Sequence, residues 1–97
     1  MDLSSTPIKN PAVLAREIFD GGMVLVNADN ASSLALSNQT AVVVWEMADG
    51  KNTVQDIIKG VKHQFQDVPD TVSSDIIAFL ELLTQDGFVG FECNYQP

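Results

Sequence analysis

The hydrophobic period of this chain changes near Asn38, and this change constrains the fold more than any other feature. Before it, short apolar runs are separated by turn residues, which is typical of β-strands. After it, apolar residues recur every three or four positions, which is typical of helices that bury one face. The chain has 97 residues, so both parts share one domain. The sequence therefore predicts an α+β fold of three antiparallel strands followed by three helices that cover one sheet face.

The part before Asn38 predicts strands separated by turns. A strand over residues 14–19 reaches Asp20-Gly21, which suits the positive φ angles of a tight hairpin turn. Residues 23–26 are apolar at every position, so this strand should be central and at least partly covered on both faces. Residues 32–37 alternate between polar and apolar faces, which predicts a half-exposed third strand.

The two ends of the chain are less strongly patterned. Residues 1–12 are rich in Ser, Thr, Pro and Asn, so we expect a mobile arm ahead of a single domain over residues 13–97. At the other end, the segment 88–93 either adds a strand or simply packs against the domain.

A helix is predicted over residues 39–48, although its sequence is ambiguous. Three consecutive valines, residues 42–44, favour a strand by propensity. The flanks favour a helix, because Ser37 or Asn38 can cap its start and Gly50 can end it in the left-handed region.

The second helix has the clearest pattern in the chain. Its apolar residues form one stripe, namely Val54, Ile57, Ile58, Val61 and Phe65. Thr53 and Asp56 stand at the spacing of a capping box, with Asp in place of the usual Glu.

The third helix should begin after a cap at Asp70 or Thr71, run to about Asp86 and close at Gly87. Its apolar stripe consists of Val72, Ile76, Phe79, Leu80 and Leu83. This stripe is broader than contact with one sheet face needs, so part of it is expected to line an apolar groove.

The charge balance disfavours several classes of partner. The chain has 5 Lys+Arg against 13 Asp+Glu and a formal net charge of −8. Nucleic acids and anionic membranes need a basic surface, so we expect neither as a partner. Residues 71–86 contain no Lys or Arg, which argues against this helix entering a DNA groove. No apolar run approaches the ~18 residues of a membrane span.

Catalytic chemistry is also poorly supplied. His63, the one histidine, lies off the apolar stripe and is expected at the surface. Cys93 has no second cysteine with which to bind a metal or form an internal disulfide. There is no phosphate-binding glycine loop. We therefore expect no enzymatic activity, no catalytic or metal-binding residues and no cofactor, in a cytoplasmic setting.

Several segments together carry a family likeness through their order and spacing. They are Asn38 to Gly50, Thr53-Val54 with Asp56-Ile57, Val72 with Asp75-Ile76, Phe79-Leu80, Leu83, and Gly87-Phe88-Val89. In these residues the chain, over roughly residues 12–90, resembles the PqqD family, which is named for the pyrroloquinoline quinone biosynthesis chaperone.

The resemblance implies a winged-helix-like fold and a peptide-binding function. Such domains bind the leader segment of a ribosomally synthesised precursor peptide as an added strand along the third strand, in a groove closed by the third helix. They present the precursor to a modifying enzyme, commonly a radical SAM enzyme. The domain itself acts as a noncatalytic peptide chaperone.

The third strand agrees with this implication on physical grounds. It is the last strand of a meander, so it should be a sheet edge with unpaired N–H and C=O groups, and it carries no proline or charge to deter another strand. Ser33 and Ala35 are small, and Asp75 and Ser33 could meet polar or basic side chains of the peptide. The expected peptide-binding residues are Ser32, Ser33, Leu34, Ala35, Leu36, Val72, Asp75, Ile76, Phe79 and Leu83.

Two other functions remain open from the sequence. One is a small winged-helix adaptor or regulatory domain that binds a protein partner. The other, less favoured, is a DNA-binding regulator. An open sheet edge can also pair with its own copy, so a homodimer is possible.

Overall fold

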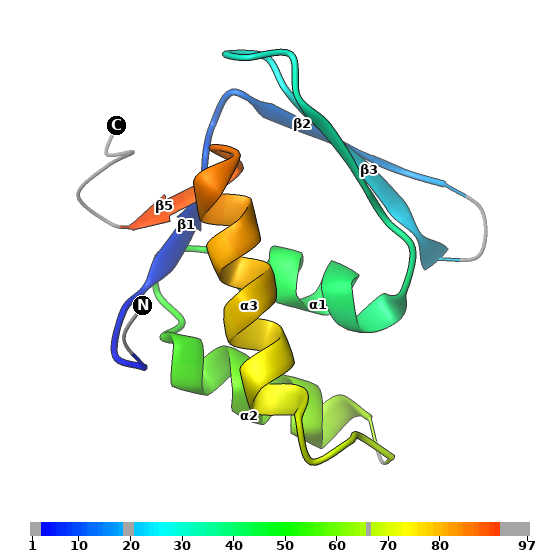
Figure 1. Cartoon of the computed structure of the whole chain (residues 1–97), viewed down its shortest axis with the longest axis vertical. Helices are drawn as coiled ribbons and strands as arrows, with labels where there is room; N and C mark the ends of the chain where they lie inside the picture. The colour runs from blue at the N-terminus through cyan, green and yellow to red at the C-terminus, as the bar shows by residue number, and fades with distance from the viewer. Residues whose placement is uncertain (1–2, 19–20, 66, 92–97) are drawn as a thin grey trace.

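The computed structural model describes residues 3–18, 21–65 and 67–91. Its elements in order are β1 (Pro7–Lys9), β2 (Val13–Glu17), β3 (Met23–Asn27), β4 (Ser33–Leu36), α1 (Gln39–Met47), α2 (Val54–Gln64), α3 (Val72–Gln85) and β5 (Val89–Phe91). The three-stranded antiparallel sheet β2-β3-β4 followed by three helices confirms the predicted α+β fold (Figure 1). Phe19, Asp20 and Cys93, on which some expectations rest, lie outside the described residues.

The main sheet has β3 at its centre and β2 and β4 at its edges. Leu25 of β3 pairs with Ala15 on one side and Leu34 on the other, and its side chain is fully buried. The helices lie on this side of the sheet (Figure 1). Val26 faces the opposite way and is 40% exposed. Val24, on the same side as Val26, is half-buried, so the second face of the central strand is covered only in part, and no described helix packs on it.

A second, two-stranded sheet joins the two ends of the chain. β1 pairs antiparallel with β5, and Ile8 lies opposite Gly90. The expectation of a mobile arm over residues 1–12 is therefore wrong for the strand β1. The open alternative for the tail is resolved in favour of a strand over Val89–Phe91.

The segment before β1 also has a structural role at the start of α2. The backbone N–H groups of Val54 and Gln55 donate to the carbonyl oxygens of Ser5 and Leu3 at 2.9 and 3.1 Å. These are first-turn amides that have no acceptor within their own helix. The N-terminal segment thus completes the N-terminus of α2.

The N-termini of α1 and α2 follow from local sequence. Asn38 caps α1, and its side chain accepts the backbone N–H of Ala41. Thr53 and Asp56 form the predicted capping box on α2. The helix predicted over residues 39–48 spans Gln39–Met47 in the structure, with Ala48 as its C-cap. Gly50 adopts a positive φ, as expected, and donates its N–H to the carbonyl of Pro7, the first residue of β1.

The C-terminus of α3 ends as expected at Gly87, which has a φ of 77°. The N–H of Phe88 donates to the carbonyl of Leu83 at 2.8 Å, and the N–H of Gly87 donates to that of Thr84 at 3.2 Å. This pair of bonds defines a Schellman motif, with the buried Phe88 and Leu83 side chains as its apolar partners. At the other end, Thr71 occupies the N-cap position without a capping side-chain bond.

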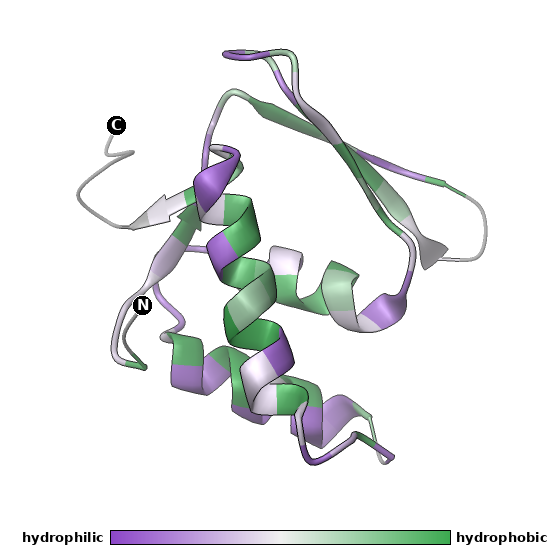
Figure 2. Cartoon of the chain, in the orientation of Figure 1, coloured by the Kyte–Doolittle hydropathy of each residue, from purple (hydrophilic) through white to green (hydrophobic). Residues whose placement is uncertain are grey.

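The core lies where the helices meet the sheet and one another. Its largest fully buried side chains include Leu25, Leu36, Ile57, Ile76, Leu80, Leu83 and Phe88. Figure 2 shows the hydrophobic stripe of α2 turned towards the rest of the domain and its hydrophilic side turned outward. Among the described residues, no helix is long and apolar enough to cross a membrane.

Candidate functional site

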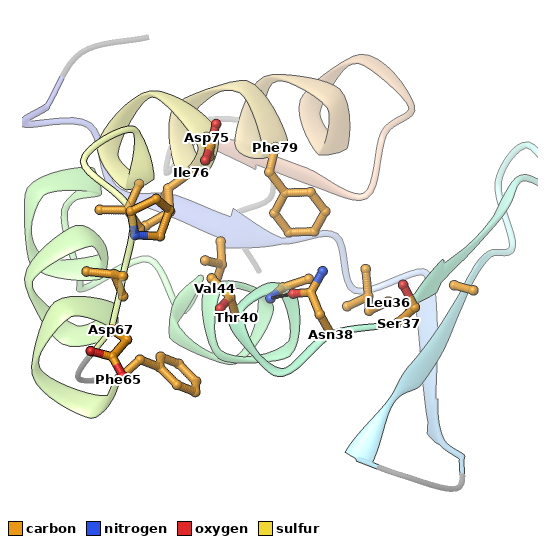
Figure 3. A pocket seen from close by; sticks show the side chains of 15 residues that line it. Leu36, Ser37, Asn38, Thr40, Val44, Phe65, Asp67, Asp75, Ile76 and Phe79 are labelled. Carbon is orange, nitrogen blue, oxygen red and sulfur yellow. Dashed lines mark hydrogen bonds between the residues drawn. The ribbon is translucent and has the colours of Figure 1, made fainter.

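A groove of about 510 Å³ opens between the end of β4, the start of α1, and α3 (Figure 3). Four segments line it: Ala35, Leu36 and Ser37 at the end of β4; Asn38, Thr40, Ala41 and Val44 around the start of α1; Phe65, Asp67, Val68 and Pro69 between α2 and α3; and Val72, Asp75, Ile76 and Phe79 on α3. Its volume falls in the range of small-ligand and side-chain pockets.

The α3 wall follows from helical periodicity. Val72, Ile76 and Phe79 recur at spacings of four and three residues, so they share one side of α3. Val72 and Ile76 are almost fully buried, whereas Phe79 is half-buried and points into the space between α3 and the end of β4 (Figure 3). Opposite them, Val44 of α1 forms a buried part of the floor. These side chains make the groove suitable for a large apolar side chain.

The free edge of β4 adjoins this groove, and the hydrogen-bond register shows which of its backbone groups face outward. The N–H of Asn27 donates to the carbonyl of Ser32 at 2.8 Å. Hydrogen bonding in an antiparallel pair alternates, so the pairs Leu25–Leu34 and Met23–Leu36 are also bonded across the two strands. The backbone groups of the intervening residues of β4 therefore point away from β3.

Ser33 and Ala35 are these outward-facing residues, and both are exposed. The opposite edge supports the assignment. There, the N–H of Ala28 donates to the carbonyl of Ala12 at 3.0 Å, and the N–H of Ile18 donates to the carbonyl of Gly22 at 3.0 Å. On β3, the even-numbered residues thus bond β2 and the odd-numbered residues bond β4. An extended chain lying along β4 would find an N–H and a C=O at each of Ser33 and Ala35.

Among the described residues, the ionisable side chains that line the groove are both carboxylates, Asp67 and Asp75. Both are exposed. Oδ2 of Asp75 accepts the hydroxyl of Thr71 at 3.1 Å. Within the described part of the chain, neither carboxylate has a Lys or Arg partner within salt-bridge distance, so the negative charge at this end of the groove is not neutralised by the fold.

The structure places the expected peptide-binding residues in two groups. Ala35, Leu36, Val72, Asp75, Ile76 and Phe79 line the groove. Ser32, Ser33, Leu34 and Leu83 do not, although Ser33 lies on the adjoining free edge. Leu83 has no exposed surface and belongs to the core beside Phe88, so it is not accessible to a peptide.

Sequence reasoning missed the part of the groove formed by α1 and by the segment between α2 and α3. Val44 lies in the valine run that was interpreted only as a helix. The segment between α2 and α3 contains the apolar residues Phe65, Val68 and Pro69. Apolar residues in a connecting segment indicate that it packs against an apolar surface of the domain, which here is the groove. Among the described residues, no group of three or more His, Cys, Asp or Glu side chains could hold a metal ion.

With this geometry in hand, comparison with known proteins identifies the family. The sequence model of the family described as coenzyme PQQ synthesis protein D (PqqD) matches residues 22–89. The chain belongs to the PqqD family. A search of curated proteins found no match.

Two solved structures have the same fold. One is TbiB1 in complex with the TbiA(beta) leader peptide, with a TM-score of 0.71 and 19% identity over 93% of this chain and 99% of that chain. The other is a lasso peptide synthetase B1 complexed with the leader peptide, with a TM-score of 0.71 and 16% identity over 89% of this chain and 99% of that chain. At these identities the comparison establishes the fold alone.

Proposed function

We propose that this protein binds the leader segment of a ribosomally synthesised precursor peptide as an added strand on β4. The observation that carries the proposal is the position of the free edge of β4 directly beside an apolar groove. The edge supplies backbone hydrogen bonds at Ser33 and Ala35, which any sequence can use. The groove supplies contacts that depend on side chains, and together they give the two parts of peptide recognition by strand addition.

Family membership and the two similar structures support this assignment. Both similar structures are complexes with leader peptides, and each matches the fold of this chain with a TM-score of 0.71. On this proposal the protein acts as a noncatalytic chaperone in the cytoplasm, where precursor peptides are made. It presents the bound precursor to a modifying enzyme, which on the PqqD likeness is a radical SAM enzyme.

An amide NMR titration tests the proposal. The ¹⁵N-labelled protein is titrated with a synthetic peptide that covers the N-terminal half of a short reading frame beside its gene. We expect shifts confined to residues 33–38 and 72–79, with the amides of Ser33 and Ala35 moving downfield as they gain acceptors. Saturable shifts that leave both of these amides unchanged would contradict strand addition on β4.

One observation favours a second function, an adaptor that docks on a folded protein. The uncovered face of the main sheet carries Leu14, which is 69% exposed, beside Val26, which is 40% exposed. Docking through this face would shift the amides of β2 and the even-numbered residues of β3 and would leave the groove unchanged. The titration with the leader peptide therefore distinguishes the two functions, because only peptide binding at the β4 edge shifts the amides of Ser33 and Ala35.

A further inference from the structure

The carboxylates that line the groove, and the spacing of Asp75 and Phe79 along α3, contain information about the sequence of the bound peptide. We infer that the bound segment carries a Lys or Arg two residues away from a large apolar residue, with the cation beside Asp75 and the apolar side chain beside Phe79. This inference rests on the proposed function, because it takes the occupant to be an extended peptide on β4.

The first argument is charge complementarity. The groove is lined by Asp67 and Asp75 and by no described Lys, Arg or His. Thr71 gives Asp75 one hydrogen bond, to Oδ2, so Oδ1 is available to a ligand. The formal charge of −8 adds a field of the same sign over the whole protein. An acidic side chain at this point would be repelled, and a neutral one would leave the carboxylates unpaired.

The second argument is geometric. Asp75 and Phe79 are four residues apart on α3, which corresponds to about 6 Å along the helix axis. Alternate residues of an extended strand point to the same side and are about 6.6 Å apart. Two side chains at positions i and i+2 of the peptide therefore match the spacing of Phe79 and Asp75.

The faces of the sheet decide which peptide side chains reach α3. Leu36 points to the helix side and is buried, whereas Ala35 points to the uncovered side. A peptide residue opposite Leu36 shares its face and so points towards α3. In Figure 3, Phe79 lies nearer to Leu36 and Ser37 than Asp75 does. The apolar residue thus lies beside the end of β4, and the cation lies two residues further along the groove.

The test is a selection of random 12-residue peptides displayed on phage against the immobilised full-length protein. Bound phage are sequenced from the wild type, from Asp75→Asn, from the charge reversal Asp75→Lys, and from Glu81→Gln. Glu81 is an exposed acid on the same helix that does not line the groove, so its variant is the matched control for net charge. Asn keeps an acceptor for the Thr71 hydroxyl, so Asp75→Asn should fold normally.

We expect wild-type peptides to be enriched in Lys or Arg two positions from Phe, Tyr, Leu or Ile. A synthetic peptide made from the wild-type selection should bind Asp75→Asn about 3- to 5-fold more weakly, as for an exposed ion pair, and should bind Glu81→Gln unchanged. Peptides selected with Asp75→Lys should carry Asp or Glu at the position of the cation.

The outcomes separate this inference from the proposed function. If selected peptides require the β4 edge, as judged by loss of binding to Ala35→Pro, but show no basic preference that changes with Asp75, the inference is overturned and strand addition stands. If no selected peptide depends on either Ala35 or Asp75, both are overturned.

Discussion

The two edges of the main sheet allow a matched proline experiment on the mode of peptide binding. Ala35 on β4 and Ala15 on β2 are both exposed and, by the alternating register, both point their N–H groups away from β3. Proline removes this N–H in each case. Because neither amide bonds within the sheet, each variant should change the free energy of unfolding by no more than about 1 kcal/mol.

The effect on peptide affinity should differ sharply between the two variants. In Ala35→Pro, the peptide loses one backbone hydrogen bond, and its own carbonyl is left unsatisfied against the groove, which costs about 1–3 kcal/mol. This corresponds to a loss of affinity of about 5- to 150-fold. Ala15→Pro lies on the opposite edge and should bind as the wild type does. Leu34→Pro, whose N–H faces β3, should instead destabilise the fold by at least about 1–3 kcal/mol.

Fluorescence anisotropy of a labelled leader peptide measures affinity, and urea unfolding measures stability on the same samples. Equal losses of affinity in Ala35→Pro and Ala15→Pro, with both proteins folded, would refute the assignment of the peptide to β4. Wild-type affinity in Ala35→Pro would refute strand addition altogether.

Three further variants test the core, the end of α3 and the acid limit of stability. Leu83→Ala should lower the free energy of unfolding by about 2–5 kcal/mol in urea titrations, because the side chain lies in the core. The peptide affinity of the folded variant should stay unchanged. A loss of affinity without a loss of stability would show that Leu83 contacts the peptide. Asn27 is buried and donates from Nδ2 to two carbonyls at the end of α3, at 3.0 and 3.2 Å, so Asn27→Ala should cost about 1–3 kcal/mol by the same measurement, and an unchanged midpoint would contradict this. The backbone N–H of Asn52 donates to Oδ1 of Asp49 and is the main cause that lowers the pKa of this carboxyl below its ordinary 3.8. Because the pKa of Asp49 is lowered in the folded state, its ionised carboxylate stabilises the fold above pH 3.8, and this stabilisation is lost as the pH falls through the lowered pKa. The difference in free energy of unfolding between wild type and Asp49→Asn should therefore shrink between pH 4 and pH 2. A difference that is independent of pH would contradict the role of this carboxylate.

Features set by local sequence could be predicted, because their causes lie within a few residues. The capping box of Thr53 and Asp56 and the apolar stripe of α2 need only helical spacing. The end of α3 at Gly87 needs only a residue that tolerates a positive φ. The exposed edge on β4 followed from the order of the strands, and the alternation of buried and exposed residues within it followed from the period of two.

Features set by contacts between distant segments could not be predicted. Residues 7–9 have no strong strand pattern, and they become a strand because β5 lies beside them. Leu83 belongs to the same stripe as Ile76, and nothing in that stripe tells which residues remain open. The structure shows the reason, because Phe88 folds back over Leu83 in the Schellman motif, whereas no described element covers Phe79 in the same way.

The lack of charge on β4 that favours peptide binding also permits self-association, and salt distinguishes the two processes. In a two-fold pair of β4 strands centred on Leu34, Ser33 of one copy would lie opposite Ala35 of the other, and both are small. Each copy carries a formal charge of −8, so the copies repel one another, and added salt screens this repulsion. A peptide with a basic residue is attracted to the same site, and added salt weakens that attraction.

We therefore expect the dimer fraction, measured by sedimentation at fixed protein concentration, to increase between 20 and 500 mM NaCl. The reason is that the screening length falls from about 20 to about 4 Å over this range, which weakens the repulsion between the copies. Over the same range, affinity for a basic leader peptide should fall, and saturating peptide should dissociate any dimer because both occupy β4. A dimer that persists in saturating peptide would place self-association on another surface, with the exposed Leu14 face of the sheet as the next candidate.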